Sequence, residues 1–375
     1  MITSNNIPSS MKAVVLEKPN TLTYREIPVW PVDSYGDSDL VLVEVDSCGV
    51  CGSDFRYYAG ENPWAQHTLG RHMDNPPNIV LGHEFAGKVV AVVDEKNAHL
   101  LGKRVAPVCS KTCGECSDCK AGRHELCAKT VHMGHGQGWG VQPFYPGAYA
   151  QYVPSWGANC YEIPENISYE EASMMDILAV CVHVAKNGNI APGRPVLIMG
   201  AGPAGNGIAQ AAKAMGASEV VITDRMDTAL NMAKSTGIDH VVDVRGKSQE
   251  ELQKELAGFA PEGYGSVFDS IGTKESFALG VKLLGKAATL VNMAVHDEEF
   301  PVNFMSLGSE RKITTSCNFA VEDFPLALSW LASGKFKVNH WLTEIKLCDV
   351  PKVFAEISKS QGERDAFKLV IRNQK

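Results

Sequence analysis

The spacing of hydrophobic positions changes about halfway along the chain. In the first third, short β-branched runs at residues 11–17, 40–50 and 87–93 are interrupted by Gly, Pro and Asp. Runs of this kind predict short strands joined by turns. Residues 109–147 are rich in Cys and Gly and show little periodicity, so we expect a lobe that a metal ion holds together.

From Pro192 onward, apolar strand-like runs alternate with helical ones. The strand-like runs cover residues 195–200, 219–224, 240–244, 264–272, 286–294 and 312–317, and helical runs cover 203–216, 226–237 and 275–285. This alternation predicts a doubly wound parallel sheet with right-handed crossovers. Two amphipathic helical stretches at 323–334 and 350–360 then precede a closing run at 366–373, which we expect to return to the first domain.

The predicted fold class is α/β, with a doubly wound parallel-sheet domain inserted into a mostly-β domain. The parallel-sheet domain is placed at residues 185–320. The mostly-β domain is placed at residues 1–184 and 321–375, with the Cys-rich lobe at about 109–147. A chain of 375 residues is long enough to bury both cores.

Composition and charge narrow the class of partner. The hydrophobic share of 45% and the 34 glycines are ordinary for a globular protein. A formal net charge of −8 leaves no basic surface for a phosphate backbone, so nucleic acid is not an expected partner. The N-terminus lacks the pattern of a signal peptide and the apolar runs are too short to span a bilayer, so we expect a cytoplasmic protein without membrane association.

Five of the eleven cysteines stand at metal-ligand spacings, which argues against a disulfide framework and for a reduced compartment. Four of them form a C-x2-C-x2-C-x7-C array, namely Cys113, Cys116, Cys119 and Cys127. Four thiolates at this spacing can enclose a structural zinc ion with no open position. The cysteines outside these spacings are expected to be bystanders or small packed residues, namely Cys48, Cys109, Cys160, Cys181, Cys317 and Cys348.

A glycine-rich loop joins the apolar run at 196–199 to an alanine-rich helical stretch. Its G-x-G-x-x-G sequence consists of Gly200, Gly202 and Gly205, with Pro203 and Ala204 between the last two glycines. The first glycine would make the tight turn, the second would let the backbone approach a pyrophosphate, and the third would allow close packing of helix on strand. The helix N-terminus would face the phosphates, which predicts a dinucleotide site.

Asp224 indicates which dinucleotide is bound. It ends the next strand, 19 residues after Gly205, where a carboxylate can accept both ribose hydroxyls. A carboxylate there repels a 2′-phosphate, so NAD is expected in preference to NADP. Arg225 could offset that repulsion, stack on the adenine or simply be solvated. Ser270 and Met293, in the runs at 264–272 and 286–294, are further candidate cofactor contacts.

Several motifs together resemble the zinc-dependent medium-chain dehydrogenases, the alcohol and polyol dehydrogenase family. They are GVCGSD around Cys51, GHEFAG around His83, the four-cysteine array, and VLIMGAGPAG followed by VITD, in order along the chain. The resemblance implies a Rossmann fold for the parallel-sheet domain and a GroES-like fold for the mostly-β catalytic domain. It also implies a catalytic zinc between the domains, with Cys51 and His83 as ligands and one open coordination position.

The third ligand that the resemblance implies is Asp176. It lies in an otherwise apolar stretch, where an unpaired carboxylate would be costly to bury and where zinc ligation would remove that cost. The alternatives are a helix-capping role for Asp176 or ligation by Cys181 instead. Glu84 resembles the family's outer glutamate that approaches the metal transiently, and Asp54 resembles the carboxylate that orients the ligand histidine.

Three further features bear on proton transfer and substrate binding. Ser53 resembles the hydroxyl of the family's proton relay. A later relay position, often His in the family, is Arg56 here, and arginine cannot act as a base at neutral pH. Either ribose hydroxyls and water complete the relay, or Arg56 binds an acidic or polyhydroxylated substrate. The long segment 59–79 is expected to overhang the substrate site, as a surface loop, a subunit contact or a part of the site.

The expected function is NAD-dependent oxidation of a secondary alcohol, such as a polyol, sugar or cyclitol, with two zinc ions per chain. The zinc-bound hydroxyl would lose its proton to the relay and its hydride to the nicotinamide. The alternatives are primary alcohol, formaldehyde or threonine-type oxidation on the same fold and, more remotely, a non-catalytic or quinone-reductase-like protein. The expected partners are a small-molecule substrate and further copies of the chain, in a homodimer or homotetramer.

Overall fold

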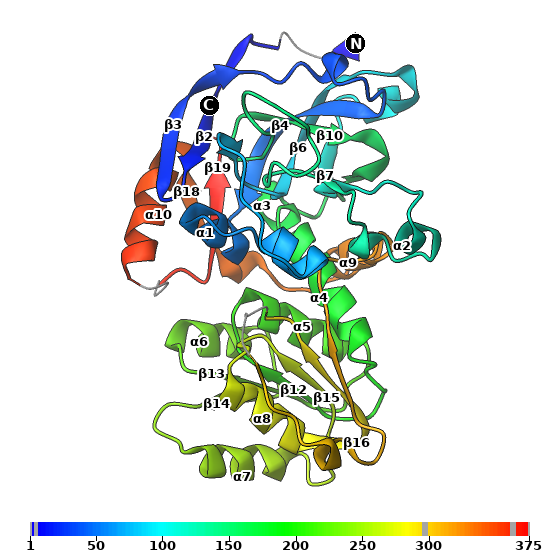
Figure 1. Cartoon of the computed structure of the whole chain (residues 1–375), viewed down its shortest axis with the longest axis vertical. Coiled ribbons are helices and arrows are strands. Elements are labelled where there is room, and N and C mark those ends of the chain that lie inside the picture. The colour runs from blue at the N-terminus through cyan, green and yellow to red at the C-terminus, as the bar shows by residue number, and fades with distance from the viewer. Residues whose placement is uncertain (1, 4–6, 295–298, 361–364, 374–375) are drawn as a thin grey trace. The chain divides into compact units, whose positions relative to one another are not determined.

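Six parallel strands form the sheet of one of two structural units, Ile177–Trp341 (Figure 1). The structure is a computed structural model and describes residues 2–3, 7–294, 299–360 and 365–373. The strand order is β14-β13-β12-β15-β16-β17, which is that of a dinucleotide-binding Rossmann fold. The strands are β12 (Val196–Met199), β13 (Val220–Asp224), β14 (His240–Asp243), β15 (Tyr264–Asp269), β16 (Leu284–Asn292) and β17 (Lys312–Thr315). The predicted parallel sheet is confirmed.

Helices precede, separate and follow these strands along the chain. They are α4 (Met175–Asn187, which begins just before the unit), α5 (Pro203–Ala214), α6 (Asp227–Ser235), α7 (Gln249–Phe259), α8 (Lys274–Leu283) and α9 (Asp323–Ala332), with the short helices η6 (Phe304–Leu307) and η7 (Asn339–Trp341). α5 packs against β12 and β13, α6 against β13 and β14, and α8 against β15 and β16. Strands β12 and β15 are buried along their whole length, as expected for parallel strands with covered faces.

The other unit, Met1–Asp176 with Leu342–Lys375, is mostly β. Its largest sheet has the order β11-β7-β6-β4-β19-β18, with β1 paired to β6 and β10 paired to β4, and two small sheets have the orders β3-β2-β5 and β8-β9. Its strands are β1 (Ile2–Thr3), β2 (Ser10–Lys18), β3 (Thr21–Pro28), β4 (Leu40–Gly49), β5 (Ile79–Val80), β6 (Glu84–Val92), β7 (Arg104–Pro107), β8 (Ser110–Lys111), β9 (Val131–His132), β10 (Tyr152–Trp156), β11 (Cys160–Glu162), β18 (Leu342–Lys346) and β19 (Lys368–Arg372). Its fold is the mostly-β one that the sequence predicts.

Helices of this unit are few and short. They are α1 (Gly52–Ala59), α2 (Ser117–Lys120), α3 (Tyr169–Ala172) and α10 (Val350–Lys359), together with η1 (Val32–Ser34), η2 (Ala65–Leu69), η3 (Glu95–Leu100), η4 (His124–Leu126), η5 (Gly157–Asn159) and η8 (Leu347–Asp349). Among the described residues, no helix of either unit is both long enough and apolar enough to cross a membrane.

The C-terminal strand returns to the first domain, as predicted. β19 pairs antiparallel with the end of β4, where Val370 lies opposite Gly49 (Figure 1). β19 also pairs in parallel with β18. The last strand of the chain therefore borders the residues that lead into the GVCGSD motif.

The boundaries between the units differ from the predicted 184 and 320. The first unit gives way at Asp176, and the second continues to Trp341. Polar contacts account for part of the difference, because the buried Asp323 at the start of α9 accepts from His183 Nδ1 of α4 at 2.7 Å and also binds Lys186. These contacts attach α9 to the parallel-sheet unit, whereas its amphipathic pattern alone favoured neither unit.

Candidate active site

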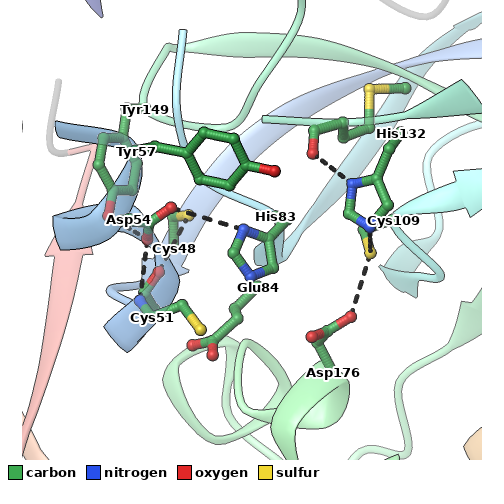
Figure 2. A network of polar contacts seen from close by, with 12 residues as sticks. Cys48, Cys51, Asp54, Tyr57, His83, Glu84, Cys109, His132, Tyr149 and Asp176 are labelled. Atoms are coloured by element: carbon green, nitrogen blue, oxygen red, sulfur yellow. Dashed lines mark hydrogen bonds and ion pairs between the residues drawn. The ribbon is translucent and has the colours of Figure 1, made fainter. Parts of the chain in front are cut away.

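Three potential metal ligands meet where helix α1 and strand β6 begin (Figure 2). The Cys51 thiol, the His83 ring and the Glu84 carboxylate each offer one ligand atom, and these atoms all lie within 4.8 Å of one another. Cys51 is the N-cap of α1, and its sulfur accepts a hydrogen bond from the backbone N–H of Asp54. The positive end of the helix dipole therefore faces the Cys51 sulfur. Thiolate, imidazole and carboxylate are zinc ligands, and three protein ligands leave a fourth position open for substrate.

The buried Asp54 carboxylate lies against both Cys51 and His83. Its Oδ2 accepts from the backbone N–H of Cys51 at 2.9 Å and from the Tyr149 hydroxyl at 2.7 Å, and its Oδ1 lies 3.6 Å from His83 Nδ1. Burial lowers the pKa of His83, but the negative charges of Asp54, Cys51 and Asp176 outweigh burial and raise that pKa well above its usual value. The site therefore holds an excess of negative charge that a bound cation would neutralise.

Glu84 is held by a buried cation that motif-based reasoning missed. The Lys368 ammonium of β19 lies 2.9 Å from Glu84 Oε1 and 2.6 Å from Oε2, and both side chains are buried. Gly49 makes room for this pair, because a Cβ atom there would lie 2.3 Å from Glu84 Oε2. The available signal was a lysine inside the apolar closing strand, since a buried lysine requires a negative partner.

Asp176, the predicted third ligand, lies outside the group of three. It is the second residue of α4, and its Oδ1 accepts from the Cys109 thiol at 3.1 Å (Figure 2). Burial raises the pKa of Asp176, and burial together with the adjacent carboxylate raises the pKa of Cys109 well above its usual value, so the thiol is a donor. Cys109 was expected to be a bystander; it is instead a direct partner of Asp176.

Two histidines that follow the cysteine array also lie beside the site. The rings of His132 and His135 stack with centroids 4.1 Å apart, and His135 lies 4.7 Å from His83 and 4.4 Å from Tyr57 by the same measure. Burial lowers the pKa of His132 to about 3 and that of His135 well below its usual value, so both rings are neutral. Sequence reasoning missed both, although VHMGHG begins four residues after the last cysteine of the array.

The four array cysteines converge around a separate point of the first unit. Their four sulfur atoms all lie within 4.8 Å of one another, with separations of 3.9 Å for Cys113–Cys119 and 3.5 Å for Cys113–Cys127. Zn–S bonds of about 2.3 Å in a tetrahedron require sulfurs about 3.8 Å apart. The backbone N–H groups of Cys116 and Cys119 point at the sulfurs of Cys113 and Cys116, at 3.4 and 3.5 Å. The backbone N–H groups of Glu115 and Cys116 lower the pKa of Cys113 to about 6, whereas burial raises the pKa of Cys119 to about 12.

The glycine loop has the geometry of a dinucleotide turn. Gly200 has a φ of +95°, which favours glycine, and Gly202 is the N-cap of α5, with Pro203 and Ala204 as the first residues of the helix. A Cβ atom on Gly205 would lie 1.8 Å from the carbonyl oxygen of Gly200, so only glycine allows this close approach of helix to strand. Gly202, as the N-cap, has no side chain to occupy the first backbone N–H groups of α5, which can therefore donate to a phosphate group.

Asp224 lies against this loop at the end of β13. Its Oδ2 accepts from the backbone N–H of Ala201 at 2.7 Å, and its Oδ1 accepts from those of Arg225 and Met226 at 2.7 and 2.8 Å. The loop and the carboxylate are thus positioned together, as a ribose contact requires. The Arg225 side chain is exposed.

Ser270 and Met293 follow the ends of β15 and β16. The Ser270 hydroxyl donates to the Met199 carbonyl at 2.8 Å, and the backbone N–H of Met293 donates to the Asp269 carbonyl at 3.0 Å. Both residues therefore lie at the carboxyl ends of parallel strands, where doubly wound folds bind their ligands.

Arg56 has its partners within the long segment that follows it. Its guanidinium binds Glu61 Oε2 through Nε at 2.8 Å and Nη2 at 2.7 Å, and it also contacts Gln66. The segment itself is anchored, because Trp64 is buried in the core of the unit. This geometry lends no support to a substrate contact by Arg56. Ser53 is half-buried in the first turn of α1.

The other cysteines follow the packing expectation with one exception. Cys48 and Cys181 are buried, and Cys160 and Cys317 are partly buried. Cys181, the alternative third ligand, donates to the Ala204 carbonyl at 3.3 Å. Cys348 is exposed, so the prediction of a packed residue is wrong there; it lies in the short helix η8 at the surface.

Two family profiles match this chain in sequence. The profile described as alcohol dehydrogenase GroES-like domain matches residues 37–165, and the one described as zinc-binding dehydrogenase matches residues 203–333. A probable D-xylulose reductase A from Aspergillus clavatus is 30% identical over 368 residues, 96% of this chain and 97% of the relative. Sorbitol dehydrogenase from Bacillus subtilis is 28% identical and covers 91% of each chain.

Among solved structures, a short chain alcohol dehydrogenase from E. coli CFT073 in complex with NADH is similar throughout. It superimposes with a TM-score of 0.82 at 26% identity and covers 97% of this chain and 100% of its own. The similarity thus extends over both structural units.

The closed array and the open site together predict two zinc ions per chain. Cys116→Ser should release one of them and lower the midpoint of thermal unfolding, because a structural zinc site contributes directly to folding. Elemental analysis of the wild type and the variant, with parallel melting curves, checks this. Cys348→Ser, an exposed cysteine outside both sites, is the control and should change neither quantity. A single zinc in fully active wild-type protein would contradict the scheme.

Proposed function

The chain belongs to the zinc-dependent medium-chain dehydrogenase family, and from this premise we propose that it transfers a hydride between a secondary hydroxyl of a polyol, sugar or cyclitol and NAD. Its class, alcohol and polyol dehydrogenase, follows from its relatives. The observation that carries the proposal is that the Cys51 thiol and the His83 ring lie within 4.8 Å of each other, with the carboxylates of Glu84 and Asp176 beside them. That donor set is suited to a zinc ion with one open position.

Zinc bound in this site supplies a Lewis acid that lowers the pKa of the substrate hydroxyl. Cys51 and His83 would hold it, and Asp54 fixes the His83 ring from its other side. Ser53, half-buried in the first turn of α1, is proposed as the first acceptor of the substrate proton. Arg56 is engaged by Glu61, so water or the cofactor's ribose would pass the proton onward.

The proposed third ligand remains Asp176, although Glu84 is the carboxylate within the group of three. The reason is the difference between their partners. Both oxygens of Glu84 face the Lys368 ammonium, which already neutralises this carboxylate. Asp176 receives a hydrogen bond from a neutral thiol, so its negative charge remains available to a metal ion. A carboxylate without a cationic partner is the better zinc ligand of the two.

For the cofactor, we propose NAD in preference to NADP. Asp224 lies against the glycine loop, where its carboxylate would accept the ribose hydroxyls and repel a 2′-phosphate. Cytoplasmic location and assembly into a homodimer or homotetramer remain predictions.

The substrate class can be tested directly with NAD and a panel of polyols, cyclitols, hydroxy acids and simple alcohols. We expect kcat/KM for the best polyol or cyclitol to exceed that for any primary alcohol by about tenfold or more, since each additional hydroxyl that is hydrogen-bonded contributes about 1 kcal/mol. Steady-state rates of NADH formation measure this. Preferred oxidation of a primary alcohol or of formaldehyde would refute the proposed substrate class.

Asp176→Asn tests the third ligand. The amide is nearly isosteric but uncharged, so activity should fall by about 100-fold or more, because zinc contributes several kcal/mol of transition-state stabilisation. The catalytic zinc should also dissociate more readily. Cys181→Ala is the matched control and should be mild. Similar, mild effects of both substitutions would eliminate Asp176 as a ligand.

Asp224→Ser tests the cofactor preference. We expect wild-type kcat/KM with NAD to exceed that with NADP by about tenfold, and the substitution to narrow or reverse this ratio, since it removes both the ribose acceptor and the repulsion of the 2′-phosphate. Kinetics with the two cofactors measure the ratio. A wild-type enzyme that already prefers NADP would mean that Arg225 determines the preference.

A further inference from the structure

The Cys109 thiol lies between Asp176 and His132, beside the active site. Cys109 lies just after strand β7 and is only 3% exposed. Its Sγ lies 3.1 Å from Asp176 Oδ1 and 3.4 Å from His132 Nε2, so it stands between a carboxylate and an imidazole (Figure 2). Among the described residues, the Cys109 thiol is the one hydrogen-bond donor to the Asp176 carboxylate.

The hydrogen-bond partners of His132 and Cys109 determine which of their atoms carry protons. His132 Nδ1 lies 2.7 Å from the carbonyl oxygen of Met133, which can only accept, so Nδ1 carries the proton. His132 Nε2 then presents a lone pair toward Cys109 and cannot donate to Asp176. Of these three side chains, Cys109 is therefore the one whose proton can reach the Asp176 carboxylate, and its thiol donates to Oδ1.

We propose that Cys109 is a positioning residue for the catalytic metal: its thiol holds Asp176 Oδ1 and thereby leaves the second carboxylate oxygen as the one offered to zinc. His132 and the Met133 carbonyl fix the thiol from its other side. This inference rests on the proposed role of Asp176 as third ligand. A hydrogen bond to the non-ligating oxygen orients the carboxylate and favours a single oxygen–metal contact.

The chain offers a closely matched control. Cys160 of β11 is partly buried and is paired with Pro107 of β7, which precedes Cys109 by two residues. Cys109→Ala and Cys160→Ala remove the same atom, one just after β7 and the other from β11, the strand paired with β7. Cys109→Ser keeps a donor at nearly the same place and should preserve the bond to Asp176.

The measurement is the rate at which zinc passes from the purified holoenzyme to a colorimetric chelator. The phase of this time course that is absent in Cys51→Ser identifies the catalytic zinc. Cys109→Ala should speed this phase about tenfold, within the range typical of lost outer partners of metal ligands. Cys109→Ser should stay within about threefold of the wild type, and Cys160→Ala should match it. The release of the array zinc should not change in any of these variants.

A double substitution separates positioning from general loosening of the fold. If Cys109 acts through Asp176, Cys109→Ala should add nothing to Asp176→Asn. The inference would be overturned if Cys109→Ala accelerated zinc release equally in the wild-type and the Asp176→Asn background. It would also be overturned if Cys109→Ala released the catalytic zinc within twofold of the wild-type rate while Asp176→Asn released it rapidly. Unchanged release from Asp176→Asn would overturn the ligand assignment itself, and the inference with it.

Discussion

The interior of the first unit depends on neutralising the negative charges that surround the His83 imidazole. Asp54 and Glu84 are fully buried, and Asp176 is partly buried beside them. Lys368 offsets one of these charges, and protonated His83 would offset another. Without a further cation the remaining carboxylates are favoured in protonated form, and burial does raise the pKa of Asp54 and of Asp176. A divalent ion allows them to be charged together, so metal binding and the stability of this interior are coupled.

The two candidate metal sites are built in different ways. The array draws its four thiols from residues 113–127, and short turns there aim backbone N–H groups at the sulfurs. The active site draws on β4, α1, β6, α4 and β19, whose residues are distant in sequence and which meet through sheet pairing. A local site needs little besides its own spacing, whereas a dispersed site requires the complete fold.

This difference explains how far sequence reasoning reached. The parallel sheet, the mostly-β unit and the glycine loop could be predicted because they depend on periodicity and on glycine at fixed positions. The array sulfurs could be grouped because their spacing is local. Lys368 and Cys109 could not be assigned partners, because no motif contains them and their partners are distant in sequence. Glu84 lies 284 residues from Lys368, and Asp176 lies 67 residues from Cys109. The sequence also could not predict that Glu84 lies nearer to Cys51 and His83 than Asp176 does. This difference depends on the directions of the two side chains, which Lys368 and Cys109 set.

The outer partners therefore determine what each carboxylate can do. Glu84 and Asp176 carry the same chemical group at the edge of the same site, yet one faces an ammonium ion and the other a neutral thiol. An ammonium partner satisfies the charge and ties both oxygens, which makes Glu84 a group that must leave its ion pair before it can approach a metal. A thiol partner engages one oxygen and leaves the charge intact, which suits a permanent ligand. Lys368 and Cys109, which no recognised motif contains, thus give two neighbouring carboxylates different partners and with them a different suitability as metal ligands.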